Sequence, residues 1–251
     1  MDLSTMLPLG VAGLCAGFID AIAGGGGLIS LPALLWAGLP PHLALGTNKL
    51  QSAAGTTMAV HRYHVARLID WPTMTVAIAA TALAATLGTV AVLWIDNRVL
   101  RAVVPWLLLA VAIHVLRRPA LGDAPTEARL SANRFGALAG SALGFYDGFF
   151  GPGAGAFWTA ACVHLRGMGL PRATAFTKVV NLTSNLAALA VFASWGQVDP
   201  ASAGAMIVGQ AVGGRIGAGL AVKHGAPFIR VVFAGVVFTL VARLLWQTLA
   251  G

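Results

Sequence analysis

Ionisable side chains lie within or at the ends of long apolar stretches of this chain. Charge is costly at membrane depth, so such residues normally face a protein interior or a water-filled cavity. Three cations against two carboxylates leave an excess of one positive charge, which favours an anion as the bound species. The alternative is architectural, with each lysine neutralising an aspartate across a helix bundle. The residues are Asp20, Lys49, Asp147, Lys178 and Arg215.

Two glycine-rich breaks, at residues 24–27 and 151–155, each separate a long apolar run from a short one. Glycine runs have little helicity, and they leave free N–H groups at the start of the following helix. Such a helix start attracts anions. Packing through small residues is the alternative, and it is the interpretation preferred for the Gly13/Gly17 and Gly140/Gly144 pairs. The predicted ligand-facing glycines are Gly24, Gly25, Gly26, Gly27, Gly151, Gly153 and Gly155.

A polar cluster follows each short run, within a segment that is otherwise apolar. Hydroxyl and amide donors can replace the hydration shell of a small oxyanion, while lysine supplies charge. Interhelical hydrogen bonding is the equally weighted alternative for the uncharged members, which also include Gln51, Ser52, Ser184 and Asn185. Asp20 and Asp147 are the predicted proton-coupling residues. The predicted substrate-binding members are Thr47, Asn48 and Lys49 in the first cluster and Thr177, Lys178 and Asn181 in the second.

These features recur because the chain contains two related halves. The offset from Asp20 to Asp147 is 127 residues in a chain of 251, and internal repetition at this scale defines the architecture. We therefore predict an N-terminal repeat over residues 1–117, a polar linker over 118–134 and a C-terminal repeat over 135–251. Arg215 breaks the symmetry, since the first half has Thr86 to Thr89 at the matching place.

Composition identifies the solvent as a lipid bilayer. Hydrophobic residues make up 58% of the chain and charged residues only 10%, far from the balance of a soluble domain. We predict an all-α polytopic membrane protein with five apolar segments in each half, four of them long enough to span and one short. The first is expected to be a retained span rather than a signal peptide. The segments are 4–22, 28–38, 42–63, 71–94 and 99–116, then 135–150, 154–165, 173–195, 201–222 and 227–249.

The distribution of Lys and Arg predicts the orientation. If all ten segments cross, one side receives most of the basic residues and is cytoplasmic, both termini lie outside, and the second half is inverted. If the short runs are re-entrant, each half has four crossings and the halves are parallel. The inverted arrangement is the one we expect. The basic residues expected on the other side are chiefly Arg98 and Arg101, with Arg243 near the end of the chain. The expected cytoplasmic residues are Arg62, Arg67, Arg117, Arg118, Arg129, Arg134, Arg166, Arg172, Lys223 and Arg230.

The doubled motif resembles the sulfite exporter TauE/SafE family of membrane permeases. The resemblance covers nearly the whole chain: G-x-x-x-G-F-x-D-A-x-x-G-G-G-G, then P-A-L-L-x-x-G-L-P-P and G-T-N, with a degenerate second copy, G-F-Y-D-G-F-F-G-P-G-x-G and A-T-A-F-T-K. It implies a bacterial inner-membrane transporter of small sulfur-containing anions such as sulfite or organosulfonates, without a bound cofactor. In the second copy Pro152 and Ala154 replace glycines, and extra residues precede Gly169.

Other function classes fit less well. An anion channel would use the same positive groups without coupled aspartates. A membrane-embedded enzyme would need a catalytic constellation such as H-E-x-x-H or G-x-S-x-G, which the sequence lacks, and a scaffold would bind no ligand. The basic residues are scattered and form no nucleic-acid-binding module. The expected partners are a small anion, the lipid bilayer and protons as a coupling ion; a homodimer is left open. The two cysteines, Cys15 and Cys162, suggest neither a disulfide nor a metal site.

Overall fold

The computed structural model describes residues 3–116 and 125–250, and these residues form helices with no strand. The predicted all-α class is confirmed, and each predicted apolar segment corresponds to a helix, the last two to α9. Arg117, Arg118 and residues 118–124 of the predicted linker lie outside the described residues. The first half contains α1 (Leu3–Ala23), α2 (Gly27–Trp36), α3 (Pro41–Val65), a 3₁₀ turn η1 (Trp71–Met74), α4 (Thr75–Leu93) and α5 (Asn97–Leu116). The second contains α6 (Ala132–Phe149), α7 (Ala154–Arg166), α8 (Leu170–Ser194) and α9 (Pro200–Ala250), which kinks at Gly225.

Glycines end the first helix of each half. Gly24, Gly151 and Gly153 have φ values of 73°, 96° and 81°, a conformation that other residues rarely adopt. The short helix that follows in the first half, α2, has 10 residues, which corresponds to a rise of about 15 Å. Four described helices are long and apolar enough to cross a membrane, namely Ser4–Ala23, Trp71–Leu93, Leu170–Ser194 and Pro200–Gly225.

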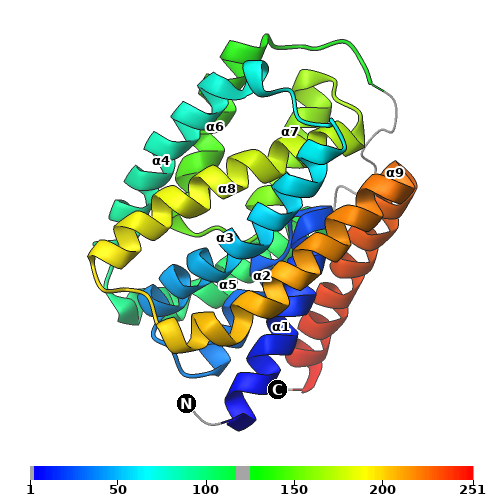
Figure 1. Cartoon of the computed structure of the whole chain (residues 1–251). Helices are drawn as coiled ribbons and strands as arrows, with labels where there is room; N and C mark the ends of the chain where they lie inside the picture. The colour runs from blue at the N-terminus through cyan, green and yellow to red at the C-terminus, as the bar shows by residue number, and fades with distance from the viewer. Residues whose placement is uncertain (1–2, 117–124, 251) are drawn as a thin grey trace.

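Helices α1 and α2 form a hairpin that starts and ends at the same end of the bundle. Gly10 of α1 packs against Ala205 near the start of α9, and Thr47 near the start of α3 accepts a hydrogen bond from the Asp199 backbone N–H, 2.9 Å away. The starts of α1, α3 and α9 therefore lie together (Figure 1). Because α2 ends only a few residues before α3 begins, it turns back towards this end. We call it the α1 end of the bundle.

The second half has a matching hairpin at the other end. The Leu165 carbonyl, near the end of α7, accepts hydrogen bonds of 3.0 and 3.1 Å from the N–H groups of Arg129 and Leu130, just before α6. Helix α7 therefore returns to where α6 began, which we call the α6 end. The prediction that all ten segments cross is wrong because both short helices turn back. The expectation that re-entrant short runs make the halves parallel also fails, since α1 and α6 start at opposite ends.

Small residues allow the long helices to pack backbone against backbone. A Cβ atom added at Gly13 or Gly17 would lie 2.5 or 2.3 Å from carbonyl oxygens of α9, and one at Gly140 would lie 2.8 Å from Ala80 of α4. At Gly144 the nearest α4 atom would be 2.9 Å away. These distances are shorter than van der Waals contact, so only glycine fits. The packing interpretation of these two pairs is confirmed.

Two apolar clusters lie on either side of a polar layer. The cluster towards the α6 end includes Tyr63, Phe135 and Trp158, and the cluster towards the α1 end includes Leu34 and Phe192. The same order holds along α3, where Leu45 precedes the buried Asn48, Lys49 and Gln51 side chains and Ala59 and Tyr63 follow them. Figure 1 shows α3 and α8 running side by side through the middle of the bundle.

A Tyr63 hydrogen bond links the end of α3 to the end of α1. Its side chain is fully buried, and its hydroxyl donates to the Ala21 carbonyl over 2.9 Å. We expect Tyr63→Phe to lower the free energy of unfolding by about 1 kcal/mol, because a buried acceptor loses its donor. The midpoint of thermal unfolding in detergent measures this change. Thr86→Val is the control, since the Thr86 hydroxyl bonds only within its own helix; equal shifts in both variants would refute the fastening role.

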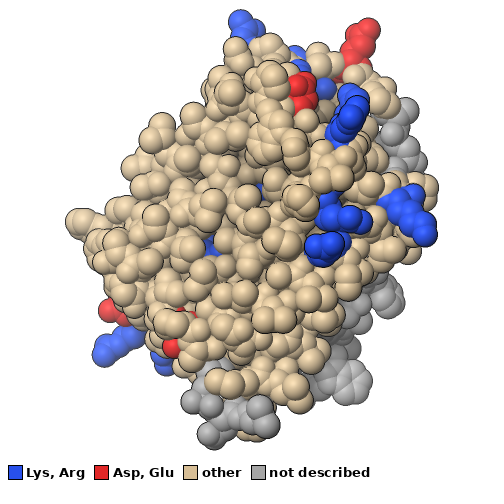
Figure 2. All heavy atoms as spheres, viewed as in Figure 1, with Lys and Arg blue, Asp and Glu red and all other residues tan. Residues whose placement is uncertain are grey.

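Charge is distributed unequally between the two ends. Arg62, Arg67, Arg129, Arg134, Arg166 and Arg172 lie at or near the α6 end, and Arg98 and Arg101 lie at or near the α1 end. Most Lys and Arg side chains on the visible face gather towards its upper right, whereas a smaller charged group lies at its lower left (Figure 2). This agrees with the asymmetry expected from the sequence. Arg215 is exposed on α9.

Candidate functional site: a cavity between two exchanged ion pairs

The intramembrane lysines and aspartates pair across the halves. Lys49 of the first half lies 2.7 Å from Asp147 Oδ1 of the second, and Lys178 of the second lies 3.1 Å from Asp20 Oδ2 of the first. Each ammonium also donates to the backbone carbonyl of its aspartate. The side chains of Lys49 and Lys178 are only 2% and 0% exposed, so neither charge has bulk water to compensate it.

The two lysines occupy corresponding places at opposite depths. Lys49 is eight residues after the first residue of α3, and Lys178 is eight residues after the first residue of α8 (49 − 41 = 178 − 170). These two helices begin at opposite ends of the bundle. Each pair therefore joins a lysine carried by the third helix of one half to an aspartate near the end of the first helix of the other.

A small polar cavity lies between the pairs. It has a volume of about 30 Å³, enough for roughly two water molecules. Its lining is almost entirely glycine, carboxylate, amide and ammonium, and the three amide side chains come from matching helices, one from α3 and two from α8. The lining residues are Asp20, Gly24, Gly27, Asn48, Lys49, Ser52, Asp147, Gly151, Gly153, Ala154, Gly155, Asn181 and Asn185.

The two glycine breaks meet at this cavity. A Cβ atom added at Gly24 would lie 2.5 Å from Gly155 Cα, and one added at Gly155 would lie 2.5 Å from Gly24 Cα. The backbones thus touch where the first turns of α2 and α7 begin. Since Gly27 and Ala154 open these helices and line the cavity, the positive ends of two helix dipoles face it.

The structure places most of the predicted residues in the lining, but not all. Gly25 and Gly26 are buried in the first break outside the lining; Gly26 packs against Ala16 and the Asp20 side chain. The Thr47 hydroxyl already accepts a hydrogen bond from the Asp199 backbone N–H. The Thr177 hydroxyl is hydrogen-bonded to the Thr159 hydroxyl, 3.1 Å away. The Thr177–Thr159 contact joins α8 to α7, as in the interhelical alternative for the uncharged polar members, whereas Thr47 is bonded to the loop before α9. Lys178 contacts the lining through Asp20.

Three lining residues are not among the predicted site residues: Ala154, which opens α7, and the polar Ser52 and Asn185. Ser52 follows Asn48 by four residues, and Asn185 follows Asn181 by four. Residues four apart share a helix face, so this spacing is the signal that would have identified them. Asn48 also accepts hydrogen bonds from Ser30 of α2 at 2.6 Å and from Gln51 at 2.7 Å, which orients its amide. Asn181 Oδ1 is buried with no described partner.

The charge of the site differs from the count made on the sequence. Because Arg215 is on an exposed face of α9, its charge does not belong to the cavity. The remaining two lysines and two aspartates balance, so the site is neutral when all four are charged. Protonating one aspartate would release its lysine and leave one positive charge beside two helix N-termini. This arrangement can accept one anionic group together with one proton.

Comparison with known proteins gives consistent matches over almost the whole chain. The sequence model of the family described as "Sulfite exporter TauE/SafE" matches residues 9–244. A "Probable membrane transporter protein" of Haemophilus influenzae is 41% identical over 235 residues, which cover 94% of this chain and 92% of that protein. "Probable membrane transporter protein YfcA" of Escherichia coli K12 is 38% identical over 235 residues, or 94% of this chain and 87% of that protein. A "Probable membrane transporter protein ORF9" of Sinorhizobium sp. is 39% identical over 239 residues, or 94% and 90%. No solved structure matches the chain significantly.

Proposed function

Because the chain belongs to the sulfite exporter TauE/SafE family of membrane transporters, we propose that it is a secondary transporter that exports small sulfur-containing anions such as sulfite or organosulfonates. The observation that carries this proposal is the neutral set of two exchanged ion pairs around a small polar cavity. The sulfur chemistry and the outward direction rest on the family description. The relatives' printed names give the membrane setting, and the four candidate spans among the described helices support a multi-pass protein.

Alternating access is the transport mode that this arrangement supports. The cavity of about 30 Å³ is too small for an oxyanion with its hydration shell. Apolar clusters lie between it and both ends of the bundle. Passage therefore requires relative movement of the halves. We propose that the two halves, residues 1–117 and 135–251, form an inverted repeat. The opposite directions of α1 and α6 support this, and so do the positions of Lys49 and Lys178, each eight residues from the start of a helix that begins at the opposite end of the bundle.

A channel is less consistent with these features. Conduction needs a path open at both ends, whereas the described residues enclose the polar layer between two apolar clusters. Exchanged ion pairs between halves would also need to break at each conduction event. Saturable flux that can be driven uphill would separate a carrier from a channel, and we expect the former.

Charge balance makes proton coupling part of the proposal. An anion entering a site of two lysines and two aspartates leaves it with a net negative charge unless one aspartate is protonated, and an uncompensated buried charge is strongly unfavourable. We therefore expect one proton to move with each negative charge of the substrate. Asp147 and Asp20 are the two groups that can accept it.

Flux in proteoliposomes tests the function and the coupling together. Sulfite and methanesulfonate flux is measured with and without an imposed pH gradient in the wild type, Asp20→Asn and Asp147→Asn. We expect saturable, gradient-dependent flux in the wild type, and flux that no longer responds to the gradient in at least one variant, because an amide cannot exchange the proton. Glu127→Gln is the matched control, an exposed carboxylate outside the cavity.

Either of two results would contradict this scheme. Unchanged pH dependence of flux in both Asn variants would show that neither aspartate carries the coupled proton. If no tested anion gives flux above that of empty liposomes, the proposed transport function is contradicted.

For the membrane orientation we propose a bacterial inner membrane with the α6 end, and with it the linker, on the cytoplasmic side. The support is the excess of arginine at that end, which is the usual mark of the cytoplasmic side. Both chain termini are then placed on the outer side.

A further inference from the structure

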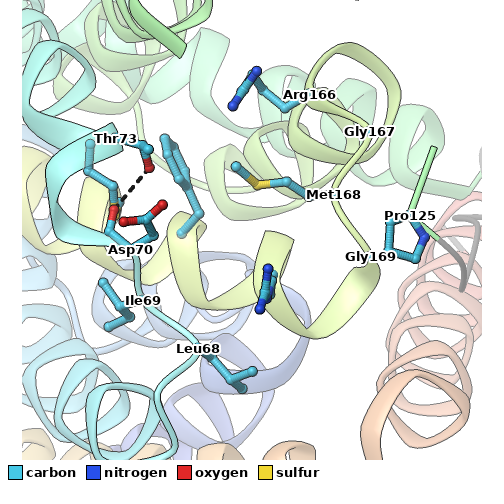
Figure 3. Close-up of a pocket in the computed structure, with 12 residues that line it drawn as sticks. Leu68, Ile69, Asp70, Thr73, Pro125, Arg166, Gly167, Met168 and Gly169 are labelled. Atoms are coloured by element: carbon cyan, nitrogen blue, oxygen red, sulfur yellow. Dashed lines mark hydrogen bonds between the residues drawn. The ribbon is translucent and has the colours of Figure 1, made fainter. Parts of the chain in front are cut away.

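A second cavity opens at the α6 end of the bundle, apart from the central one. It has a volume of about 240 Å³, eight times that of the central cavity, 30 Å³. The loop between α3 and η1 forms one wall, and the loop between α7 and α8 forms the other (Figure 3). We call it the vestibule. Its lining residues are Leu68, Ile69, Asp70, Thr73, Met74, Pro125, Arg166, Gly167, Met168, Gly169, Arg172 and Phe176.

The vestibule combines cationic and apolar groups. Arg166 is held in place because its guanidinium donates to the Leu130 carbonyl over 2.7 Å. Arg172 is exposed, and among the described residues it has no ion-pair or hydrogen-bond partner. Met74, Met168 and Phe176 supply apolar surface between them. Figure 3 shows Asp70 on the opposite wall from Arg166, so two positive charges face one negative charge.

The arginine at the start of α8 is not required by the local fold. The turn Gly169-Leu170-Pro171-Arg172 corresponds to Gly38-Leu39-Pro40-Pro41 in the first half, where the same kind of turn carries proline in place of arginine. Both turns lead directly into a long helix with proline in its first turn. Arg172 therefore adds charge to a turn that forms without it.

An aromatic cluster separates the vestibule from the central site. Phe176 lines the vestibule and packs against Phe135 and Trp158, with ring centroids 5.8 and 6.0 Å apart. The residues that follow it on α8, Thr177 and Lys178, belong to the polar layer. A ligand in the vestibule would thus be one aromatic layer away from the Lys178–Asp20 pair.

From this arrangement we infer that the vestibule is a distinct binding site for a small organic anion, with its acidic head at Arg166 and Arg172 and its apolar part against Met74, Met168 and Phe176. A planar guanidinium binds sulfonate, carboxylate or phosphate oxygens well. This inference deepens the proposed function, because the site would hold the anion before it enters the cavity between the ion pairs. The acidic group that binds the two arginines could belong to a free organic anion or to the head group of an anionic lipid.

Calorimetric titration of the purified protein in detergent with butane-1-sulfonate tests the inference independently of transport. We expect Arg172→Gln to weaken binding about tenfold through loss of a charge-assisted contact, and Arg172→Lys to weaken it less. Asp70→Asn should strengthen binding, since it removes the only opposing carboxylate in the lining. The matched control is Arg134→Gln, which removes the same charge from an exposed position at the same end but outside the lining.

The double variant Lys49→Met/Asp147→Asn distinguishes the two sites. Its binding of butane-1-sulfonate should persist, because the vestibule is intact. Binding that disappears in this variant yet persists in Arg172→Gln would overturn the inference, and so would equal weakening by Arg172→Gln and Arg134→Gln. Since binding is measured without flux, failure of the proposed transport function would leave this result unaffected.

Nanodiscs of defined composition identify the source of the anion. Wild-type affinity for butane-1-sulfonate is compared in phosphatidylcholine alone and with added phosphatidylglycerol. If phosphatidylglycerol leaves the affinity unchanged, the site binds a free anion. If phosphatidylglycerol lowers the affinity in the wild type but not in Arg172→Gln, the site binds a lipid head group. If phosphatidylglycerol lowers the affinity equally in Arg172→Gln, the lipid acts at another place, and this result contradicts the vestibule as the binding site.

Discussion

Replacing Lys49 with methionine is expected to destabilise the protein by about 3–5 kcal/mol, the usual penalty for leaving one member of a buried ion pair without its partner. Asp147 would keep a charge that is 5% exposed and lose its only ion-pair partner among the described residues. Its backbone carbonyl would lose a donor as well. Thermal or denaturant-induced unfolding in detergent measures the stability, and proteoliposome flux measures the function.

The double variant Lys49→Met/Asp147→Asn separates architecture from transport. Both charges are then removed, so most of the lost stability should return. If the pair serves transport, flux stays absent in this stable protein. A double variant that regains both stability and flux would show that the pair serves only the fold. Stability that does not return would mean that Lys49 makes further contributions of its own.

Replacing Gly155 with alanine is expected to have the second largest effect. The new methyl carbon would lie 2.5 Å from Gly24 Cα and 2.8 Å from the Gly24 carbonyl oxygen. Neither backbone atom can move aside as a flexible side chain would, so the two breaks must separate. Overpacking of this kind costs about 1–3 kcal/mol, and we expect it also to displace the first turn of α7 from the cavity. Unfolding midpoint and flux are the two measurements.

Gly204→Ala provides the matched control for this substitution. A Cβ atom there meets nothing within 4 Å, and the residue lies in the first turns of α9. Alanine favours helix more than glycine does, so stability should stay the same or rise by up to about 1 kcal/mol. A Gly155→Ala protein with wild-type stability and flux would show that the breaks need no close contact.

Features that depend on local chemistry could be predicted from the sequence. The helix breaks follow from consecutive glycines, which have little helicity in any context. The polar layer follows from charged residues in apolar segments, which must be buried or solvated. Asn48, Lys49, Asp147 and Asn181, which the sequence singles out as polar residues of apolar segments, all line the cavity.

Features that depend on which surfaces meet could not be predicted. The sequence allows each lysine to neutralise an aspartate but does not say which one, and the structure pairs Lys49 and Lys178 each with an aspartate of the other half. Spacing along a helix defines a face but does not identify the helix that packs on it. The same limit applies to Thr47, whose partner is the Asp199 N–H in the loop before α9. It applies to Arg215 as well, since only the packing of α9 decides that this side chain is exposed.

Exchange of the ion pairs has a consequence for biosynthesis. A first half made alone would carry Asp20 and Lys49 without either of their partners, because both lie in residues translated later. Its third helix would therefore hold an unneutralised ammonium until α6 has been inserted. Each half is thus an incomplete folding unit, and separately expressed halves should be degraded when alone and rescued when produced together.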